Sequence, residues 1–320
     1  MWGSTSWLCE ARRGGCEDVS DGTSGRFGLP GMANMAGVPN AADVMGMTDM
    51  AGALQEGARN VKAREEKEDG MTVNIGLARS YGRGAAEKRP CTIRCHVLET
   101  APGSALVECG KTKVLCAVTI DESVKRWRRG SGKGWVTAEY AMMPASTGTR
   151  TPRETPRRQG RSMEIERLIG RSLRTVVDMG ALGGEVTFHV DCDVVQADGG
   201  TRTASITGAW VALADALRTW KAAGKIAGDP LTGQVAAISV GQVAGRLLLD
   251  LDYSEDSRAE VDMNLVMNAD GDIVEVQGTG ERTPFSRDKF DRMLDMAHDG
   301  IRELLEVQRA ALAEVEGDRR

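Results

Sequence analysis

The chain has 320 residues, of which 41% are hydrophobic and 27% are charged, a composition typical of a globular protein and unlike that of a fibrous one. No window approaches the uninterrupted apolar stretch that a membrane-spanning helix needs, so no membrane partner is expected. The formal net charge is -5, which excludes a uniformly basic nucleic-acid-binding protein but not one with a local basic region.

Residues 1–75 differ in composition from the rest of the chain. They are rich in Gly, Ala and Met, contain few branched aliphatic residues and show no sustained period. This pattern predicts a disordered N-terminal extension, followed by a folded domain over residues 76–320. The segment lacks the apolar core of a secretory signal, and Glu10 and Glu17 are untypical of organelle transit peptides. A cytoplasmic protein is therefore expected.

The cysteines are odd in number, and most of them lie in apolar, strand-like runs. There are seven: Cys9, Cys16, Cys91, Cys95, Cys109, Cys116 and Cys192. They are expected to be free thiols in a reducing compartment. Cys91 and Cys95 are four residues apart with no second pair downstream, which does not favour a zinc site.

Alternation of apolar and polar residues predicts three strands after residue 90, over 92–97, 104–108 and 112–119. Gly110 and Lys111 form a hairpin connection between the last two. The polar stretch that follows, 121–161, is rich in Gly, Pro and Arg. It is long for a loop in a compact domain, and loops of that length are usually functional or disordered.

Basic residues are concentrated between positions 125 and 174, where thirteen Lys or Arg face only four Glu. The rest of the chain is correspondingly acidic. Such segregation suits a polyanion bound at one region of an otherwise acidic particle. The alternative is a solvated basic loop that binds nothing.

A strand-to-helix junction follows a predicted amphipathic helix over 165–177, which Gly180 or Gly183 would end. Period-two alternation marks a strand over 186–194, and helical spacing begins at Ile206 on a helix in which Trp210 and Trp220 are expected to be core residues.

Between that strand and helix, Gly200, Thr201 and Arg202 would present backbone N–H groups, a hydroxyl and a guanidinium at a helix N-terminus, which describes an anion site. In the alternative interpretation, Asp198 or Thr201 caps the helix and Arg202 faces solvent.

The C-terminal part repeats the strand-and-turn pattern. Strands over 235–243 and 247–253 are joined at Ala244 and Gly245, and strands over 265–267 and 273–276 are joined through 268–271. A charged helix over 286–314, capped by Ser286, completes the chain. The fold class is α+β, with mixed or antiparallel sheets and packed helices, because the connections are too short for a doubly wound dinucleotide-binding fold.

Six carboxylates crowd into thirteen residues after position 249: Asp250, Asp252, Glu255, Asp256, Glu260 and Asp262. Like charges so close together are unfavourable unless they are solvated or a cation lies among them. Spacing alone leaves both an exposed acidic loop and a cation site open.

The order of these segments resembles the ribonuclease PH family, phosphorolytic exoribonucleases that trim the 3′ ends of tRNA precursors. The likeness covers roughly residues 80–315 and is carried by eight segments: 103–108 (GSALVE), 112–116 (TKVLC), 134–140 (GWVTAEY), 163–169 (MEIERLI), 191–208, 255–257 (EDS), 262–264 (DMN) and 275–279 (EVQGT). It implies the ribosomal S5 domain 2-like fold, a catalytic domain over 76–320, and a homo-hexamer built as a trimer of dimers.

The resemblance also implies roles for individual residues. Arg161 would join Gly200, Thr201 and Arg202 in binding inorganic phosphate, the co-substrate. Asp256 and Asp262 would hold a magnesium or manganese ion beside the scissile bond, and would form the catalytic set with Arg202. A basic loop would grip the tRNA through Arg150, Arg153, Arg157 and Arg158. Ala145 stands where the family usually has an arginine.

The expected reaction is attack by inorganic phosphate on the last 3′,5′ phosphodiester of an RNA, such as a tRNA precursor, with release of a nucleoside diphosphate. The reverse reaction would add nucleotides. The alternative is a catalytically silent RNA-binding ring subunit on the same fold. Such a subunit would be expected to lose the phosphate and metal residues, and this chain keeps all of them.

Overall fold

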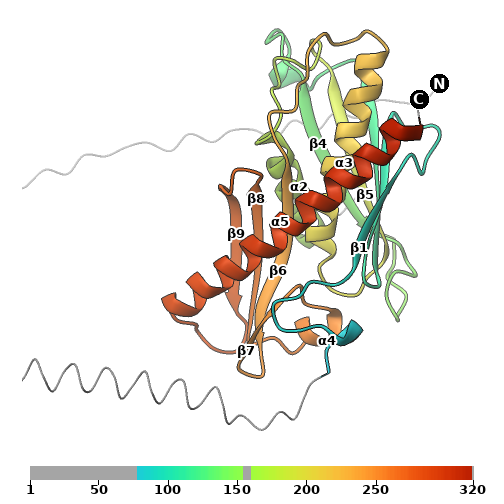
Figure 1. Ribbon diagram of the computed structural model, residues 1–320. Coiled ribbons are helices and arrows are strands. Elements are labelled where there is room, and N and C mark those ends of the chain that lie inside the picture. The colour runs from blue at the N-terminus through green and yellow to red at the C-terminus, as the bar shows by residue number, and fades with distance from the viewer. Residues whose placement is uncertain (1–77, 154–159, 319–320) are drawn as a thin grey trace, which may run out of the picture. The chain divides into compact units, whose positions relative to one another are not determined.

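The computed structural model describes residues 78–153 and 160–318, and these form an α+β fold with two β-sheets (Figure 1). The predicted fold class is therefore confirmed. The predicted extension over 1–75 lies outside the described residues. Among the described residues, no helix combines the length and the apolar character that crossing a bilayer requires.

The first sheet has five strands in the order β1-β2-β3-β5-β4, and all neighbours are antiparallel except the parallel pair β4 and β5. The strands are β1 (Cys91–Cys95), β2 (Gly103–Cys109), β3 (Thr112–Asp121), β4 (Trp135–Met142) and β5 (Thr187–Gln196). Helix α2 (Gly160–Arg174) is the crossover between β4 and β5. It ends before the predicted limit, because Val177 instead forms an isolated bridge with Leu231.

Strand β4 corrects the prediction of one long loop over 121–161. Its buried residues, Val136, Ala138 and Tyr140, alternate with more exposed ones, which is the strand period. The strand contains small and polar residues. Its pairing partner is β5, from which the whole of α2 separates it in sequence, so local sequence gives only a weak signal.

Helix α3 (Thr201–Ala222) packs on the first sheet and also contacts β6 of the second. It lies unusually close to β2, because a Cβ at Gly103 would be 2.3 Å from the carbonyl oxygen of Ala212 and a Cβ at Gly208 would be 2.2 Å from a side-chain atom of Val107. Trp210 is buried in the core, as expected. Close packing fixes the position of the helix N-terminus relative to the sheet.

The second sheet has four antiparallel strands in the order β7-β6-β8-β9. They are β6 (Val235–Val243), β7 (Arg246–Leu249), β8 (Val261–Asn268) and β9 (Ile273–Gly280). Every residue of β6 is buried, because α3 and α5 both pack against this strand. The β8–β9 hairpin is longer than predicted, and the predicted strand over 247–253 ends at Leu249 because Asp252 caps the short helix α4 (Tyr253–Asp256).

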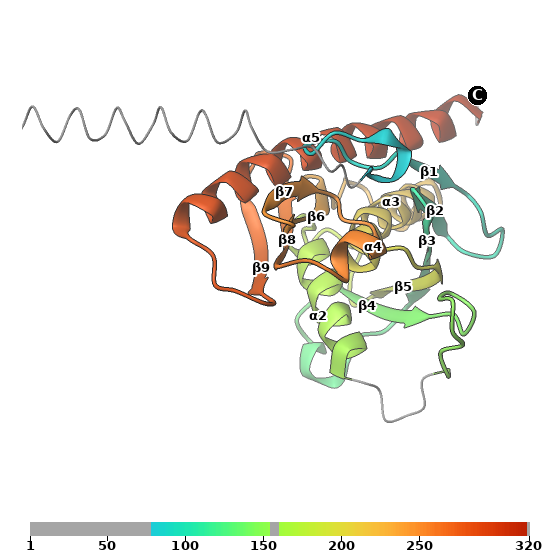
Figure 2. The ribbon, with the colours of Figure 1, turned by 90° about the horizontal axis from the view of Figure 1, so that it is seen from below.

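Helix α5 (Arg287–Asp318) joins the two sheets. It packs along β6, β7 and β8 and continues past β1, as Figure 2 shows. The oxygen of Ser286 accepts a hydrogen bond from the N–H of Lys289 at 3.3 Å, which confirms the predicted cap. A second apolar core lies between this helix and the four-stranded sheet.

Two cysteines correct the expectation of free thiols. Cys91 and Cys109 lie opposite each other on β1 and β2, with Cα atoms 4.1 Å apart, and form a disulfide. The sequence could not show this pairing because it depends on the register of the two strands. Cys95, Cys116 and Cys192 are free. Cys9 and Cys16 lie outside the described residues.

Candidate active site

Six of the residues that the sequence analysis singled out line one pocket, which has a volume of about 350 Å³. They are Arg161, Gly200, Thr201, Arg202, Asp256 and Asp262. The elements that contribute them are the first turns of α2 and α3, the short helix α4 and strand β8. These segments are far apart in the sequence, so the fold assembles the site.

The N-terminus of α3 is shaped by two glycines with positive φ, Gly199 at 75° and Gly200 at 64°. Gly200 is the N-cap residue, and no side chain caps the helix. The alternative in which Asp198 or Thr201 caps it is therefore wrong. Within the described part of the chain, the backbone N–H groups of residues 201–203 have no acceptor. Free N–H groups at a helix N-terminus form a ready anion site.

Glycine is required at position 199 because another chain segment passes close to it. A Cβ there would lie 2.5 Å from the carbonyl oxygen of Leu251 and 2.9 Å from the backbone nitrogen of Tyr253. The loop before α4 is therefore packed directly against the anion site. This contact brings Asp256 into the same pocket as Arg202.

Side-chain hydrogen bonds hold two of the anion-site residues. Arg202 donates to Oε1 of Gln277 at 2.9 Å, and the hydroxyls of Thr201 and Tyr140 are 2.9 Å apart. Burial raises the pKa of Tyr140, against the opposing effect of the Thr201 hydrogen bond and of the nearby Arg161 and Arg202 charges. Tyr140 therefore remains a neutral phenol, available to hold the Thr201 hydroxyl.

The six crowded carboxylates separate into two groups in the structure. Asp250, Asp252 and Glu255 are buried, so they do not form the exposed acidic loop that the sequence left open. Glu255 accepts hydrogen bonds from two buried arginines, Arg79 and Arg83. These three carboxylates are structural.

The roles of Asp252 and Glu260 follow from their contacts. Asp252 caps α4 by accepting a hydrogen bond from the N–H of Glu255 at 3.0 Å and also accepts one from the Ser80 hydroxyl at 2.7 Å. Glu260 accepts hydrogen bonds from the Gln242 side chain and from the backbone of Gly245. Only Asp256 and Asp262 line the pocket.

Asp256 and Asp262 have no ion-pair partner among the described residues. The amide of Asn264 donates to Asp262 at 3.4 Å. Burial and then the charge of Asp256 raise the pKa of Asp262 to about 6, and burial raises the pKa of Asp256 against the opposing charges of Arg161 and Arg202. Two half-buried carboxylates that repel each other favour a bound cation.

The donor set fits a magnesium ion. Magnesium usually binds one or two carboxylates and completes its shell with water and substrate phosphate oxygens. Over 78–153 and 160–318, no group of three or more Asp, Glu, His or Cys is placed to hold a metal by itself. Asp256 and Asp262 could therefore bind such an ion together with a phosphate-bearing substrate.

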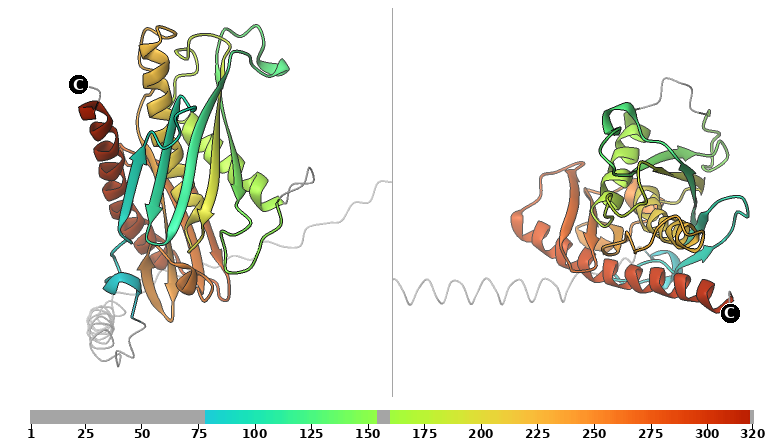
Figure 3. Two further views of the ribbon diagram at one scale, coloured as in Figure 1. Left: turned by 90° about the vertical axis from the view of Figure 1, so that its right-hand side faces the viewer. Right: turned by 90° about the horizontal axis from the view of Figure 1, so that it is seen from above.

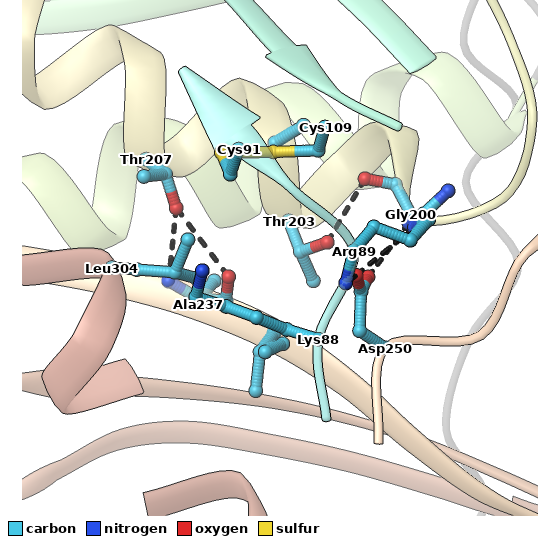
Figure 4. Close-up of a pocket in the computed structure, with 12 residues that line it drawn as sticks. Lys88, Arg89, Cys91, Cys109, Gly200, Thr203, Thr207, Ala237, Asp250 and Leu304 are labelled. Carbon is cyan, nitrogen blue, oxygen red and sulfur yellow. Dashed lines mark hydrogen bonds and ion pairs between the residues drawn. A yellow bond between two sulfur atoms is a disulfide. The ribbon is translucent and has the colours of Figure 1, made fainter. Parts of the chain in front are cut away.

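Arg89, which no local sequence feature predicted, supports the loop that precedes the candidate anion site. This arginine is 1% exposed and pairs with Asp250 through two hydrogen bonds of 2.7 and 2.9 Å (Figure 4). It also donates to the carbonyl oxygens of Asp198 at 2.5 Å and Gly199 at 3.4 Å. Together with the Thr112 hydroxyl, which donates to the Gly199 carbonyl at 2.7 Å, these bonds hold the loop that leads into α3. An arginine before Pro90 carries no local signal of this role, because its partner is 161 residues away.

Two of the four predicted RNA-binding arginines, Arg150 and Arg153, are exposed on the loop after β4. Thr147 and Thr151 of the same loop line the pocket. The loop therefore leads from the pocket to exposed positive charge. Arg157 and Arg158 lie outside the described residues.

Comparison with known proteins gives consistent matches. The sequence matches both domain models of the 3′ exoribonuclease family, domain 1 over residues 87–218 and domain 2 over residues 233–300. Ribonuclease PH of Parasynechococcus marenigrum (strain WH8102) is 53% identical over 239 residues, which are 75% of this chain and 96% of that protein. Ribonuclease PH of Moorella thermoacetica is 53% identical over 241 residues, again 75% and 96% of the two chains.

Solved structures of similar fold include the Archaeoglobus fulgidus exosome with RNA bound to the active site and an archaeal exosome core. The first has a TM-score of 0.62 at 24% identity and covers 72% of this chain and 92% of that one. The second has a TM-score of 0.58 at 23% identity and covers 80% and 98%. These likenesses confirm the expected ribosomal S5 domain 2-like fold.

Proposed function

This chain belongs to the 3′ exoribonuclease family, and on that premise we propose that the pocket at the N-terminus of α3 holds orthophosphate beside the 3′ end of an RNA. The chain is a phosphorolytic 3′ to 5′ exoribonuclease of tRNA processing, a nucleotidyltransferase that uses phosphate as its co-substrate. The observation that carries the site assignment is that four anion-binding residues and two carboxylates line one pocket.

Orthophosphate would be bound by the backbone N–H groups of residues 201–203, the Thr201 hydroxyl and the guanidinium groups of Arg161 and Arg202. Two cations match the charge of hydrogen phosphate, and the planar fork of arginine can donate to two oxygens at once. Gln277 supports this arrangement because it holds Arg202 by a 2.9 Å hydrogen bond.

The reaction forms a bond between a phosphate oxygen and the last phosphorus of the RNA and breaks the bond from that phosphorus to the preceding 3′ oxygen. The products are a shortened RNA with a free 3′ hydroxyl and a nucleoside diphosphate. Hydrogen phosphate carries the proton that the leaving 3′ oxygen needs. The protein therefore requires no covalent nucleophile, and it contributes alignment and neutralisation of charge.

A magnesium or manganese ion held by Asp256 and Asp262 would neutralise a phosphodiester oxygen of the RNA. The half-burial of both carboxylates and the raised pKa of Asp262, about 6, support this assignment. Arg150, Arg153, Arg157 and Arg158 would bind the RNA backbone without reading its sequence. We place the catalytic unit in residues 76–320 and infer a cytoplasmic homo-hexamer, arranged as a trimer of dimers, from the family.

The test is an assay with a 3′-extended tRNA, magnesium and phosphate. Nucleoside diphosphates should be released, and none should be released when phosphate is omitted. Release of nucleoside monophosphates would refute phosphorolysis. Arg202→Ala should abolish turnover, whereas Arg246→Ala, on the exposed start of β7, serves as a matched control and should not change it. A silent ring subunit would release no nucleotide under any of these conditions.

A further inference from the structure

An exposed tryptophan lies on the short 3-10 turn η3 (Arg126–Arg128) just before β4. The Trp127 side chain is 62% exposed, an unusual position for the largest apolar residue. The proposed phosphorolysis does not use it.

The indole of Trp127 is held by its neighbours. Its ring makes an edge contact with the ring of Trp135, with centroids 5.0 Å apart at 89°. The Arg128 guanidinium lies 5.7 Å from the Trp127 ring and 4.7 Å from the Trp135 ring, and its Nε donates to the carbonyl of Gly134 at 3.1 Å. Arg174, at the end of α2, covers the Trp135 ring at 4.7 Å. The exposed ring is thus fixed in one orientation.

The turn and the loop after it carry an excess of positive charge, although the Glu185 carboxylate accepts a hydrogen bond from the N–H of Gly132 at 3.2 Å. Five cations and no carboxylate occur between Ser123 and Gly134: Lys125, Arg126, Arg128, Arg129 and Lys133. All of them are exposed except Arg128, which is half-buried. A rigid, exposed aromatic face within a basic surface matches single-stranded nucleic acid, whose bases stack on aromatic rings while its phosphates contact Lys and Arg.

The position of the turn fits an RNA that extends away from the active site. Strand β4 begins at Trp135 beside the turn and ends at Met142, which lines the catalytic pocket. The strand is roughly 23 Å long at about 3.3 Å per residue. Figure 3 shows the turn and the loop after β4 at opposite ends of the sheet. Nucleotides at the turn would therefore lie several positions upstream of the reacting 3′ end.

We propose that Trp127, supported by Arg128 and Trp135, is a stacking platform for the single-stranded RNA upstream of the 3′ end. The proposal rests on the proposed function, because it assumes that the 3′ end occupies the pocket lined by Arg202 and Asp256. The group that would stack on Trp127 is the base of an unpaired ribonucleotide, several positions from the scissile bond.

The test compares Trp127→Ala and Trp127→Phe with wild type on a long and a short oligoadenylate, the short one filling only the active site, at saturating phosphate. Ile273→Ala, which truncates another exposed apolar side chain, is the matched control. Trp127→Ala should raise KM for the long RNA by roughly 5- to 150-fold, the range that loss of one stacked base implies. Trp127→Phe should retain most of the affinity. Turnover at saturation and all constants for the short RNA should stay unchanged.

The stacking role would be refuted if Trp127→Ala left KM for the long RNA unchanged or raised KM for the short RNA equally. It would also be refuted if the substitution changed the mass measured by sedimentation, because the ring would then contact another copy of the chain. None of these results bears on the proposed function, which is tested by the release of nucleoside diphosphates by the wild-type protein. If wild type released none with phosphate present, the proposed function itself would fail.

Discussion

Replacing Arg89 by methionine should weaken phosphate binding, although Arg89 is buried and does not line the proposed catalytic pocket. Methionine keeps an unbranched side chain, although a shorter one, and removes all five donors. The carbonyl of Asp198 then loses its 2.5 Å hydrogen bond from Arg89, while the carbonyl of Gly199 keeps the one from the Thr112 hydroxyl at 2.7 Å. The N–H groups that follow in the chain are expected to lose their alignment.

The substitution should have two effects of different size. Asp250 would be left as a buried carboxylate without its cation, which costs about 3–5 kcal/mol of folding free energy. Misplacing one N–H that donates to phosphate costs about 1.5–3 kcal/mol of binding free energy. That loss corresponds to a rise in KM for phosphate of roughly 10- to 150-fold.

The assay is nucleoside diphosphate release at varied phosphate and saturating RNA, with the melting temperature measured in parallel. The double variant Arg89→Met/Asp250→Asn removes the buried charge, so it should recover much of the stability while KM for phosphate stays high. Arg94→Met, an exposed arginine on β1, is the control and should change neither quantity. A lower melting temperature with an unchanged KM for phosphate would refute a positioning role and leave Arg89 as a purely structural residue.

Four further outcomes are expected. Arg202→Ala and Asp256→Ala should each lower kcat by about 100-fold or more, measured in the same release assay, with little change in RNA affinity by filter binding. Burial raises the pKa of Asp262 to about 6. In the absence of metal, the protonated carboxyl therefore contributes to the stability of the fold at low pH, and this contribution is lost as the pH rises through about 6. Magnesium should therefore raise the melting temperature little at about pH 5 and clearly at about pH 7.5, and an equal rise at both would argue against Asp262 as a ligand. Arg150→Ala should weaken RNA binding and should reduce the slope of log K against log salt concentration by about 0.7. An unchanged slope would mean that Arg150 contacts no phosphate. Gly199→Ala should lose phosphate-dependent activity, because its Cβ would lie 2.5 Å from a backbone carbonyl oxygen.

Local sequence predicted most of the secondary structure. The hairpins at Gly110 and Gly245, the cap at Ser286 and the strand-to-helix junction at Gly200 all rest on signals within a few residues. Turn residues and hydrophobic periodicity depend on positions within a few residues of one another, so they can be recognised from the sequence alone. The same local signals predicted an anion site at Gly200, Thr201 and Arg202, whereas Arg161 was implied only by the family resemblance.

The tertiary structure decided which residues of one type are structural and which line the pocket. Spacing alone did not distinguish the six carboxylates, and only the family resemblance implied Asp256 and Asp262 as the metal pair. The fold pairs Glu255 with buried arginines and places Asp256 and Asp262 in the pocket. Arg89, the Cys91–Cys109 pair and strand β4 depend on partners that register or a crossover brings together. Spacing along the chain cannot report such partners, because burial and pairing are set by contacts between distant segments.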